Sequence, residues 1–198
     1  MRKTIAISLA SSALGLQAAV FDFSLAGNGG SGLLPSNEIP PITGSTASGS
    51  ANGPIQYNDS NNQLTFDISF SVPSGATFAS IKGPADANTG GADNLYIFHA
   101  SDYFNGEGAP SGSLTSPGIS SPTPLTLVAN PNGVPNYSIA QQESDLKAGL
   151  WYIEIASNDH AFGEIRGNLT LVPEPGQYAM LTGLALAGYA AIRRKLRR

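Results

Sequence analysis

The sequence predicts an all-β fold, an antiparallel Greek-key-like β-sandwich with one short helix. The chain has 23 glycines and 14 prolines among its 198 residues, a composition that favours many turns. Residues 63–72, 150–156 and 164–171 alternate apolar and polar side chains, the period of two typical of strands. The absence of cysteine excludes a disulfide scaffold and a thiol nucleophile, and the 12% charged content excludes a coiled coil.

The three alternating segments each place one set of apolar residues on one face. Those sets are Leu64, Phe66, Ile68, Phe70 and Val72, then Trp151, Ile153 and Ile155, then Ile165, Gly167, Leu169 and Leu171. Shorter strands are expected at residues 20–26, 50–57, 76–82, 95–99 and 124–129, giving seven or eight strands with turn signals between them. This pattern is typical of an antiparallel sandwich.

One helix is expected at residues 139–148. Ser138 with Gln141 three residues later forms a capping box, and Gly149 suits the position after the last turn. Turn residues are concentrated at 27–36, 58–62, 83–94 and 104–122. The last of these segments is long for a compact domain, so we expect a mobile loop or an insertion there.

The two ends of the chain are expected to be targeting segments. Residues 1–19 have a basic start, an apolar stretch and small residues, the layout of a signal peptide cleaved after Ala18 or Ala19. A buried N-terminal strand or helix is the alternative. Residues 178–192 are apolar except for Thr182, and a basic tail follows them. Such a segment predicts a short transmembrane helix with the domain exported and the basic end inside.

Between these ends the chain is acidic. From residue 20 to residue 173 only Lys82, Lys147 and Arg166 are basic, against thirteen aspartates and glutamates. A surface of this charge repels phosphate backbones, so nucleic-acid binding is not expected. The sequence therefore divides into a signal peptide (1–19), a β-sandwich domain (20–172) and a C-terminal segment (173–198).

The C-terminal segment resembles the PEP-CTERM sorting signal. The resemblance depends on Val172, Pro173, Glu174 and Pro175 followed by the apolar run and the Arg-rich tail. It implies export by the Sec machinery, transient anchoring in the inner membrane of a Gram-negative bacterium, and processing by exosortase. The destination would then be the cell surface or a secreted exopolysaccharide matrix. An ordinary linker before a tail anchor is the alternative.

The domain itself resembles the CHRD family over about residues 21–172. The most specific segments are Asn37-Glu38-Ile39-Pro40-Pro41 and Gly163-Glu164-Ile165-Arg166-Gly167. The resemblance implies an exported domain with no settled enzymatic activity. Relatives commonly have histidines where this chain has Ser80 and Lys82, and often another within the strand at 152–156. Any histidine-dependent role of those relatives is therefore not expected here.

Few residues suggest catalysis, and we expect no enzyme and no catalytic residue. His99 and His160 are the only histidines, and with Asp102 and Asp159 they could hold a transition metal only if their loops met. No G-x-S-x-G turn supports a Ser-His-Asp triad. Paired carboxylates for glycoside cleavage occur by chance among thirteen acids. Tyr96, Tyr103 and Phe104 either stack on sugar rings or cover the core or a loop.

Calcium is the one cofactor with a candidate loop. Asp86, Asn88 and Asp93 offer oxygen ligands in a Gly-bearing segment, without the ligand spacing of an EF-hand. An ordinary turn is the alternative, because Asp and Asn bond to their own backbone in turns. Arg166 is interpreted as a residue that fixes a loop, pairing with Glu38 or Glu164, rather than as a substrate ligand.

Together these patterns predict an exported, non-enzymatic protein of the surface or of the exopolysaccharide matrix. Its expected partners are the Sec machinery and exosortase, both transient, and exopolysaccharide. The alternative is an extracellular adhesion module that binds carbohydrate or calcium. A metal-dependent enzyme is the more distant alternative.

Overall fold

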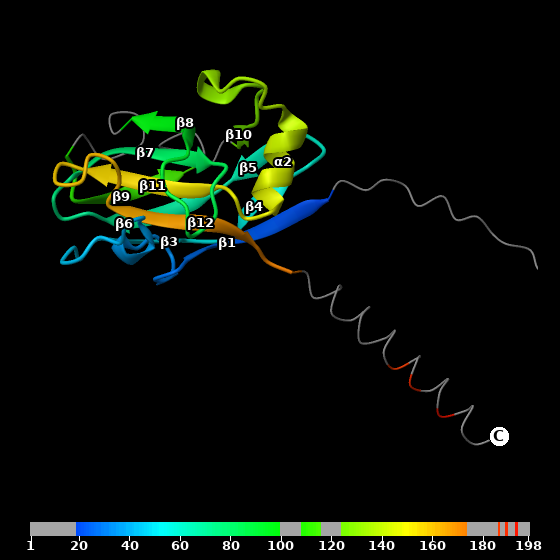
Figure 1. The fold of residues 1–198 in the computed structure, drawn as a ribbon, viewed down its shortest axis with the longest axis horizontal. Coiled ribbons are helices and arrows are strands. Elements are labelled where there is room, and N and C mark those ends of the chain that lie inside the picture. Colours follow the sequence, from blue (N-terminus) through cyan, green and yellow to red (C-terminus); the bar gives the residue numbers. More distant parts are fainter. Residues whose placement is uncertain are drawn as a thin grey trace, which may run out of the picture.

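The protein folds into two antiparallel sheets with one short α-helix, as a computed structural model shows for residues 19–99, 108–115 and 124–173 (Figure 1), together with residues 186, 189 and 193. The predicted all-β sandwich-like fold is therefore confirmed. Within these residues, no helix is long and apolar enough to span a membrane. Residues 1–18 and nearly all of the apolar run at 178–192 lie outside the described part of the chain.

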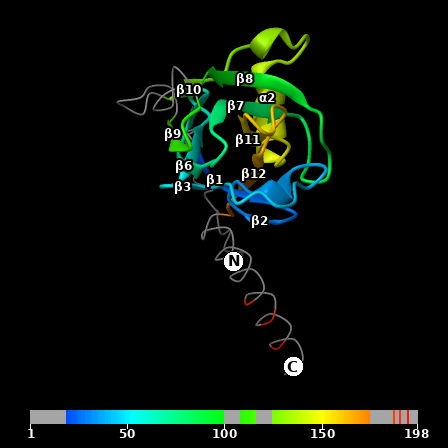
Figure 2. The ribbon, with the colours of Figure 1, turned by 90° about the vertical axis from the view of Figure 1, so that its left-hand side faces the viewer.

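The larger sheet has nine strands. In spatial order they are β10 (Leu125–Thr126), β5 (Gln63–Thr65), β4 (Ile55–Asn58), β1 (Val20–Gly27), β12 (Ile165–Leu171), β11 (Tyr152–Ser157), β7 (Ala76–Gly83) and β8 (Asp93–His99), with β2 (Gly30–Ser31) beside β1. The smaller sheet contains β3 (Ser48–Ala51), β6 (Asp67–Ser71) and β9 (Ser111–Thr115). Figure 2 shows β3, β6 and β9 on one side of the succession β8, β7, β11 and β12.

The alternating segment at 63–72 is two strands rather than the single strand expected. β5 ends at Thr65 in the larger sheet and β6 begins at Asp67 in the smaller one. Phe66, at the crossing point, is 1% exposed. The alternation continues across the crossing because both sheets turn the same face of this segment into one core. Residues 50–57 divide in the same way, between β3 and β4.

The helix α2 (Ile139–Lys147) forms as predicted. Ser138 is its N-cap, and the Ser138 hydroxyl accepts a hydrogen bond from the Gln141 amide at 3.2 Å. Gly149 follows the helix with a φ of +77°, a conformation that favours glycine. The buried Gln142 donates to the Val128 carbonyl at 2.7 Å, which fastens the helix to the chain beyond β10.

Several short elements were not predicted. They are β2, β9 and the 3-10 turns η1 (Pro35–Asn37) and η2 (Pro131–Gly133). β9 lies inside the segment 104–122, and it pairs with β6 along its whole length. That part of the segment is therefore sheet rather than a mobile loop. Residues 104–107 and 116–122 lie outside the described part of the chain.

The central strands β11 and β12 are buried on both faces. Their apolar faces contribute Ile153, Ile155, Ile165 and Leu169 to the core between the sheets. Their other faces are also covered: Glu154 is 4% exposed and Arg166 is 1% exposed. The cover comes from two irregular segments, residues 33–42, which contain η1, and residues 84–92, between β7 and β8. We call these the η1 segment and the β7–β8 loop.

The η1 segment approaches β12 closely at a glycine. Leu34 and Arg166 exchange two backbone hydrogen bonds, and a β-carbon at Gly167 would lie 2.6 Å from the Gly32 carbonyl oxygen. We therefore expect Gly167→Ala to destabilise the domain by about 1–3 kcal/mol, because the backbone must move apart. Gly53→Ala is the control, since a β-carbon at Gly53 would meet nothing within 4 Å. Urea denaturation of residues 20–173 measures the stability of both variants. Equal unfolding midpoints for Gly167→Ala and Gly53→Ala would contradict the prediction.

Candidate functional site

The covered face of β7, β11 and β12 contains a row of polar side chains. In the strand register Glu154 of β11 lies between Ser80 of β7 and Arg166 of β12. Two residues earlier on the same face of β11, Tyr152 lies between Lys82 of β7 and Asn168 of β12. The ammonium group of Lys82 forms an ion pair with the Glu154 carboxylate. We call these six residues, with Glu38 of the η1 segment, the buried polar cluster.

Arg166 fixes the β7–β8 loop through main-chain carbonyls. Its guanidinium donates to the Thr89 carbonyl at 2.9 Å and to the Asp86 carbonyl at 2.6 Å, and it lies 3.7 Å above the Tyr152 ring. The interpretation of Arg166 as a residue that fixes a loop is confirmed. The expected pairing with Glu38 or Glu164 is wrong, because the five donors of a guanidinium fork also suit carbonyl oxygens and the loop presents two of them.

Asn168 fixes the same loop at its beginning. Its side-chain amide donates to the Ala85 carbonyl and to the Gly149 carbonyl, each at 3.0 Å. Asn37 has a similar role in the η1 segment, where its amide group donates to the Arg166 carbonyl at 3.0 Å. Both segments that cover the polar face are thus held by buried side chains rather than by strand pairing alone.

The candidate calcium ligands use their oxygens within the loop. The Asp86 carboxylate accepts hydrogen bonds from the Asn88 amide at 2.8 Å and the Thr89 hydroxyl at 2.9 Å, which hold the Asp86 pKa below its usual range. The Asn88 side-chain oxygen accepts from Asn28. Asp93 lies at the start of β8, opposite Gly83. No cluster of three or more acidic, His or Cys side chains that could hold a metal occurs among the described residues. The calcium site stays a prediction.

Glu38 is one of three incompletely satisfied members of the buried polar cluster, with Ser80 and Arg166. It is 7% exposed, and one of its carboxyl oxygens has no hydrogen-bond partner among the described residues. Burial, and then repulsion from Glu154, raise the pKa of Glu38 to about 8, although Arg166 and Lys82 oppose the shift. Burial also raises the pKa of Glu154. At neutral pH Glu38 is therefore mostly protonated, which leaves the two cations Lys82 and Arg166 opposite the single carboxylate of Glu154.

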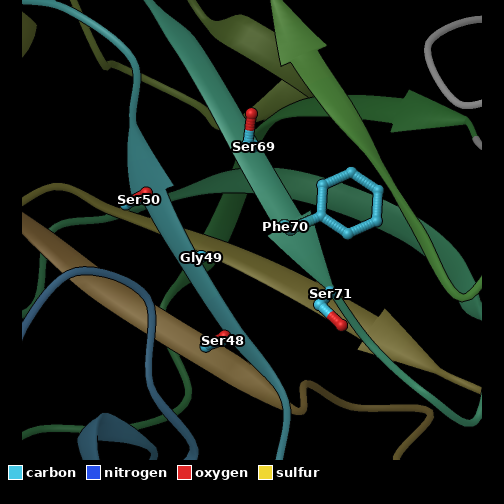
Figure 3. A pocket seen from close by; sticks show the side chains of 6 residues that line it. All are labelled: Ser48, Gly49, Ser50, Ser69, Phe70 and Ser71. Carbon is cyan, nitrogen blue, oxygen red and sulfur yellow. The ribbon is translucent and has the colours of Figure 1, made fainter.

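The outer face of the smaller sheet is covered with serine hydroxyls. Ser48 lies opposite Ser71, and Ser50 opposite Ser69; Ser71 and Ser69 then lie opposite Ser111 and Ser113 of β9. All six side chains are exposed. Figure 3 shows the shallow hollow of about 350 Å³ between β3 and β6 that four of them line with Gly49 and Phe70. We call these six residues the serine face.

A second hollow, of about 370 Å³, lies where β3 begins and β6 ends. Its lining residues are Thr43, Gly44, Ser45, Thr46, Pro73, Ser74, Asp159, His160 and Glu164. The Glu164 carboxylate accepts from the Ser45 hydroxyl at 2.6 Å and the Ser74 hydroxyl at 2.9 Å. Burial alone would raise the pKa of Glu164, but hydrogen bonds from serine hydroxyls hold it below its usual range. We call this the Glu164 hollow.

The remaining candidates are placed as follows. His160 and Asp159 lie at the Glu164 hollow, whereas the His99 side chain and Asp102 lie outside the described part of the chain. The Tyr96 hydroxyl donates to Gln142 at 2.9 Å and its ring packs against Trp151, so this tyrosine covers the core. Tyr103 and Phe104 lie outside the described residues, as do Glu174 and Pro175 of the sorting motif.

Sequence reasoning missed the serine face, although a signal was available. Each strand of the smaller sheet contains a serine–x–serine triplet, S-G-S at 48–50, S-F-S at 69–71 and S-G-S at 111–113. Such triplets place two hydroxyls on the same face of a strand. Glycine and serine are also typical of turns, so the triplets alone do not predict strands.

Two antiparallel sheets, a strand arginine that fastens a neighbouring loop and shallow hydroxyl-lined hollows together define an all-β, sandwich-like domain. The CHRD domain model matches residues 30–169, so the chain belongs to the CHRD family. No curated protein and no solved structure matches the chain.

The role of Arg166 can be tested with Arg166→Lys. We expect this change to destabilise the domain by about 2–4 kcal/mol, because one ammonium cannot replace a fork that reaches two separate carbonyls. In this variant, amide hydrogen exchange should accelerate more in the β7–β8 loop than in the rest of the domain. The control is Lys147→Gln, which removes a half-exposed ion pair with Glu143 and should cost under about 1 kcal/mol. Unchanged exchange in the loop would contradict the assigned role.

The pKa of Glu38 predicts that stability falls as pH rises from about 5 to about 8. Over this range the unfolded chain has lost the Glu38 proton, near the ordinary value of 4.5, while the folded domain keeps it up to about 8. The slope is at most about 1.4 kcal/mol per pH unit for this group. Glu38→Gln should flatten the slope of the free energy of unfolding, measured by urea denaturation.

Glu164→Gln is the matched control for this pH series. The pKa of Glu164 is lowered, so its contribution to stability is complete above pH 5 and is lost only in more acidic solution. This variant should therefore keep the wild-type slope between pH 5 and pH 8. A Glu38→Gln variant with the wild-type slope would show that Glu38 is ionised in the folded domain.

Proposed function

We propose that the chain is an exported, non-enzymatic CHRD protein of the cell surface or the exopolysaccharide matrix. Its C-terminal segment would be removed by exosortase at the motif formed by Val172, Pro173, Glu174 and Pro175. The support is the order of the segments: a Pro-Glu-Pro motif, then an apolar run, then an Arg-rich tail. The same order implies a Gram-negative inner membrane as the place of processing.

The pairing of β1 with β12 is the structural observation that supports this proposal. Phe23 lies opposite Leu171, and the Val172 amide donates to the Asp22 carbonyl at 2.8 Å. The first and last strands of the domain are therefore neighbours, and β1 begins at the end of the sheet where β12 finishes. Cleavage near Pro175 breaks none of the described strand pairing, so the released domain would keep its fold.

The use of the buried charges supports a binding role rather than a catalytic one. Arg166 binds loop carbonyls, and Lys82 and Glu154 bind each other beneath the covering segments. Arg166 and Glu154 are buried, and the Lys82 side chain is only 13% exposed. The two hollows beside the smaller sheet are shallow and lined mainly by hydroxyls.

A carbohydrate-binding adhesion module is the second candidate. The serine face favours it, because the exposed hydroxyls of Ser48, Ser50 and Ser71, which have no partner among the described residues, can exchange hydrogen bonds with sugar hydroxyls. Calcium binding at Asp86, Asn88 and Asp93 has no comparable support, since no cluster of three acidic, His or Cys side chains occurs among the described residues.

The intact mass of the protein tests the sorting proposal. We expect the chain from cells that contain exosortase to end near Pro175 and to begin near residue 19 or 20. The chain from cells without exosortase should retain its tail and fractionate with the inner membrane. Glu174→Ala should retain the tail in both strains. An uncut tail in both strains for the unaltered protein would leave a membrane-anchored periplasmic domain and would overturn the matrix location.

A further inference from the structure

We infer that the Glu164 hollow and the serine face together form one binding site for an extended glycan without anionic groups. The inference gives a ligand class to the surface or matrix role proposed above and depends on that role only for its biological setting. It concerns the outer face of the smaller sheet and the turn between β11 and β12, and none of the buried polar cluster.

The two hollows lie end to end along the same two chain segments. Residues 43–46 line the Glu164 hollow and lead directly into Ser48 and Ser50 of β3. On the neighbouring strand, Ser69 and Ser71 of β6 lead directly into residues 73–74 of the same hollow. Because Ser48 pairs with Ser71, both segments enter the hollow at the same end of the sheet. The track spans up to roughly 20 Å, which suits several sugar rings rather than one.

The serine face provides unoccupied hydrogen-bonding groups. The hydroxyls of Ser48, Ser50 and Ser71 have no hydrogen-bond partner among the described residues, and Figure 3 shows them on the two strands of the hollow. Each hydroxyl can donate one hydrogen bond and accept two, the same capacity as a sugar hydroxyl. The small side chains also leave a shallow surface on which an extended chain can lie.

The Glu164 hollow provides a fixed acceptor at one end of this track. Glu164 is 4% exposed, and the Ser45 and Ser74 hydroxyls hold its carboxylate in place. Asp159 and His160 complete the rim, and His160 is half-buried. A positioned carboxylate beside an imidazole can bind vicinal sugar hydroxyls or a sugar ammonium through charge-assisted hydrogen bonds.

The charge of the site selects against acidic glycans. No lysine or arginine lines either hollow, while Asp159 and Glu164 line the Glu164 hollow. Uronate and sulfate groups would meet only negative charge there, in a domain that is acidic as a whole. Uncharged or amino-bearing sugars meet no such repulsion.

The test is affinity electrophoresis of the full-length chain in mild detergent, in gels that contain hydroxyethylcellulose, chitosan oligosaccharides or alginate. We expect retardation by the first two and none by alginate. Ser71→Gln inserts a longer side chain into the track and His160→Gln removes the imidazole at its end. Each should weaken binding by at least about fivefold. Ser24→Gln is the matched control, because Ser24 is an exposed strand serine of β1 in the other sheet, and should bind as the unaltered chain does.

Each contrary outcome identifies what is wrong. The absence of retardation by both uncharged and amino-bearing glycans overturns the site, provided that circular dichroism shows folded protein. Equal binding by Ser71→Gln, His160→Gln and Ser24→Gln overturns its location. Retardation by alginate alone overturns the charge argument, and loss of binding in EDTA replaces direct recognition with a bridging cation. The mass measurement of C-terminal processing does not depend on glycan binding, so the two proposals fail separately.

Discussion

The buried guanidinium of Arg166 joins three parts of the chain that are far apart in sequence. Its side chain holds the β7–β8 loop at Asp86 and Thr89, while its backbone exchanges hydrogen bonds with Leu34 of the η1 segment. Both segments lie over the same face of the larger sheet. If this charge were left unpaired, its burial would cost several kcal/mol, so the covering segments and the arginine require each other. The buried face of the sandwich depends on this arrangement.

The buried polar cluster also determines how the domain responds to pH. Lys82 and Arg166 are only partly matched by Glu154, and Glu38 is buried close enough to repel it. The result is a carboxyl group that stays protonated in the folded domain well above its ordinary pKa. The buried polar cluster favours one position of the η1 segment at some cost in the free energy of unfolding. Buried polar groups have this role in some other folds.

How much of this could be predicted from the sequence differs from element to element. The capping box at Ser138 and the alternation of 164–171 predicted α2 and β12, because both signals are local. The division of 63–72 between two sheets was not predictable. The alternation of apolar and polar residues is the same whether the chain continues in one strand at Phe66 or crosses there to the other sheet. Arg166 was correctly expected to fix a loop. Its partners were missed because carbonyl oxygens occur at every residue and have no sequence signature. The serine face was missed because its triplets consist of turn-forming residues.

The distribution of polar groups over the two sheets explains why recognition is proposed for the smaller one. On the larger sheet, β11 and β12 have polar residues on the face away from the core, but the η1 segment and the β7–β8 loop cover them. On the smaller sheet, six serine side chains lie on the corresponding face and nothing described lies over them. At the edge of this face, Asn52 forms hydrogen bonds with Asp67 and Ser69. The hydroxyls of Ser48, Ser50 and Ser71 form no such bonds among the described residues and remain available, and the neighbouring Glu164 hollow supplies the fixed charge that a flat hydroxyl surface lacks.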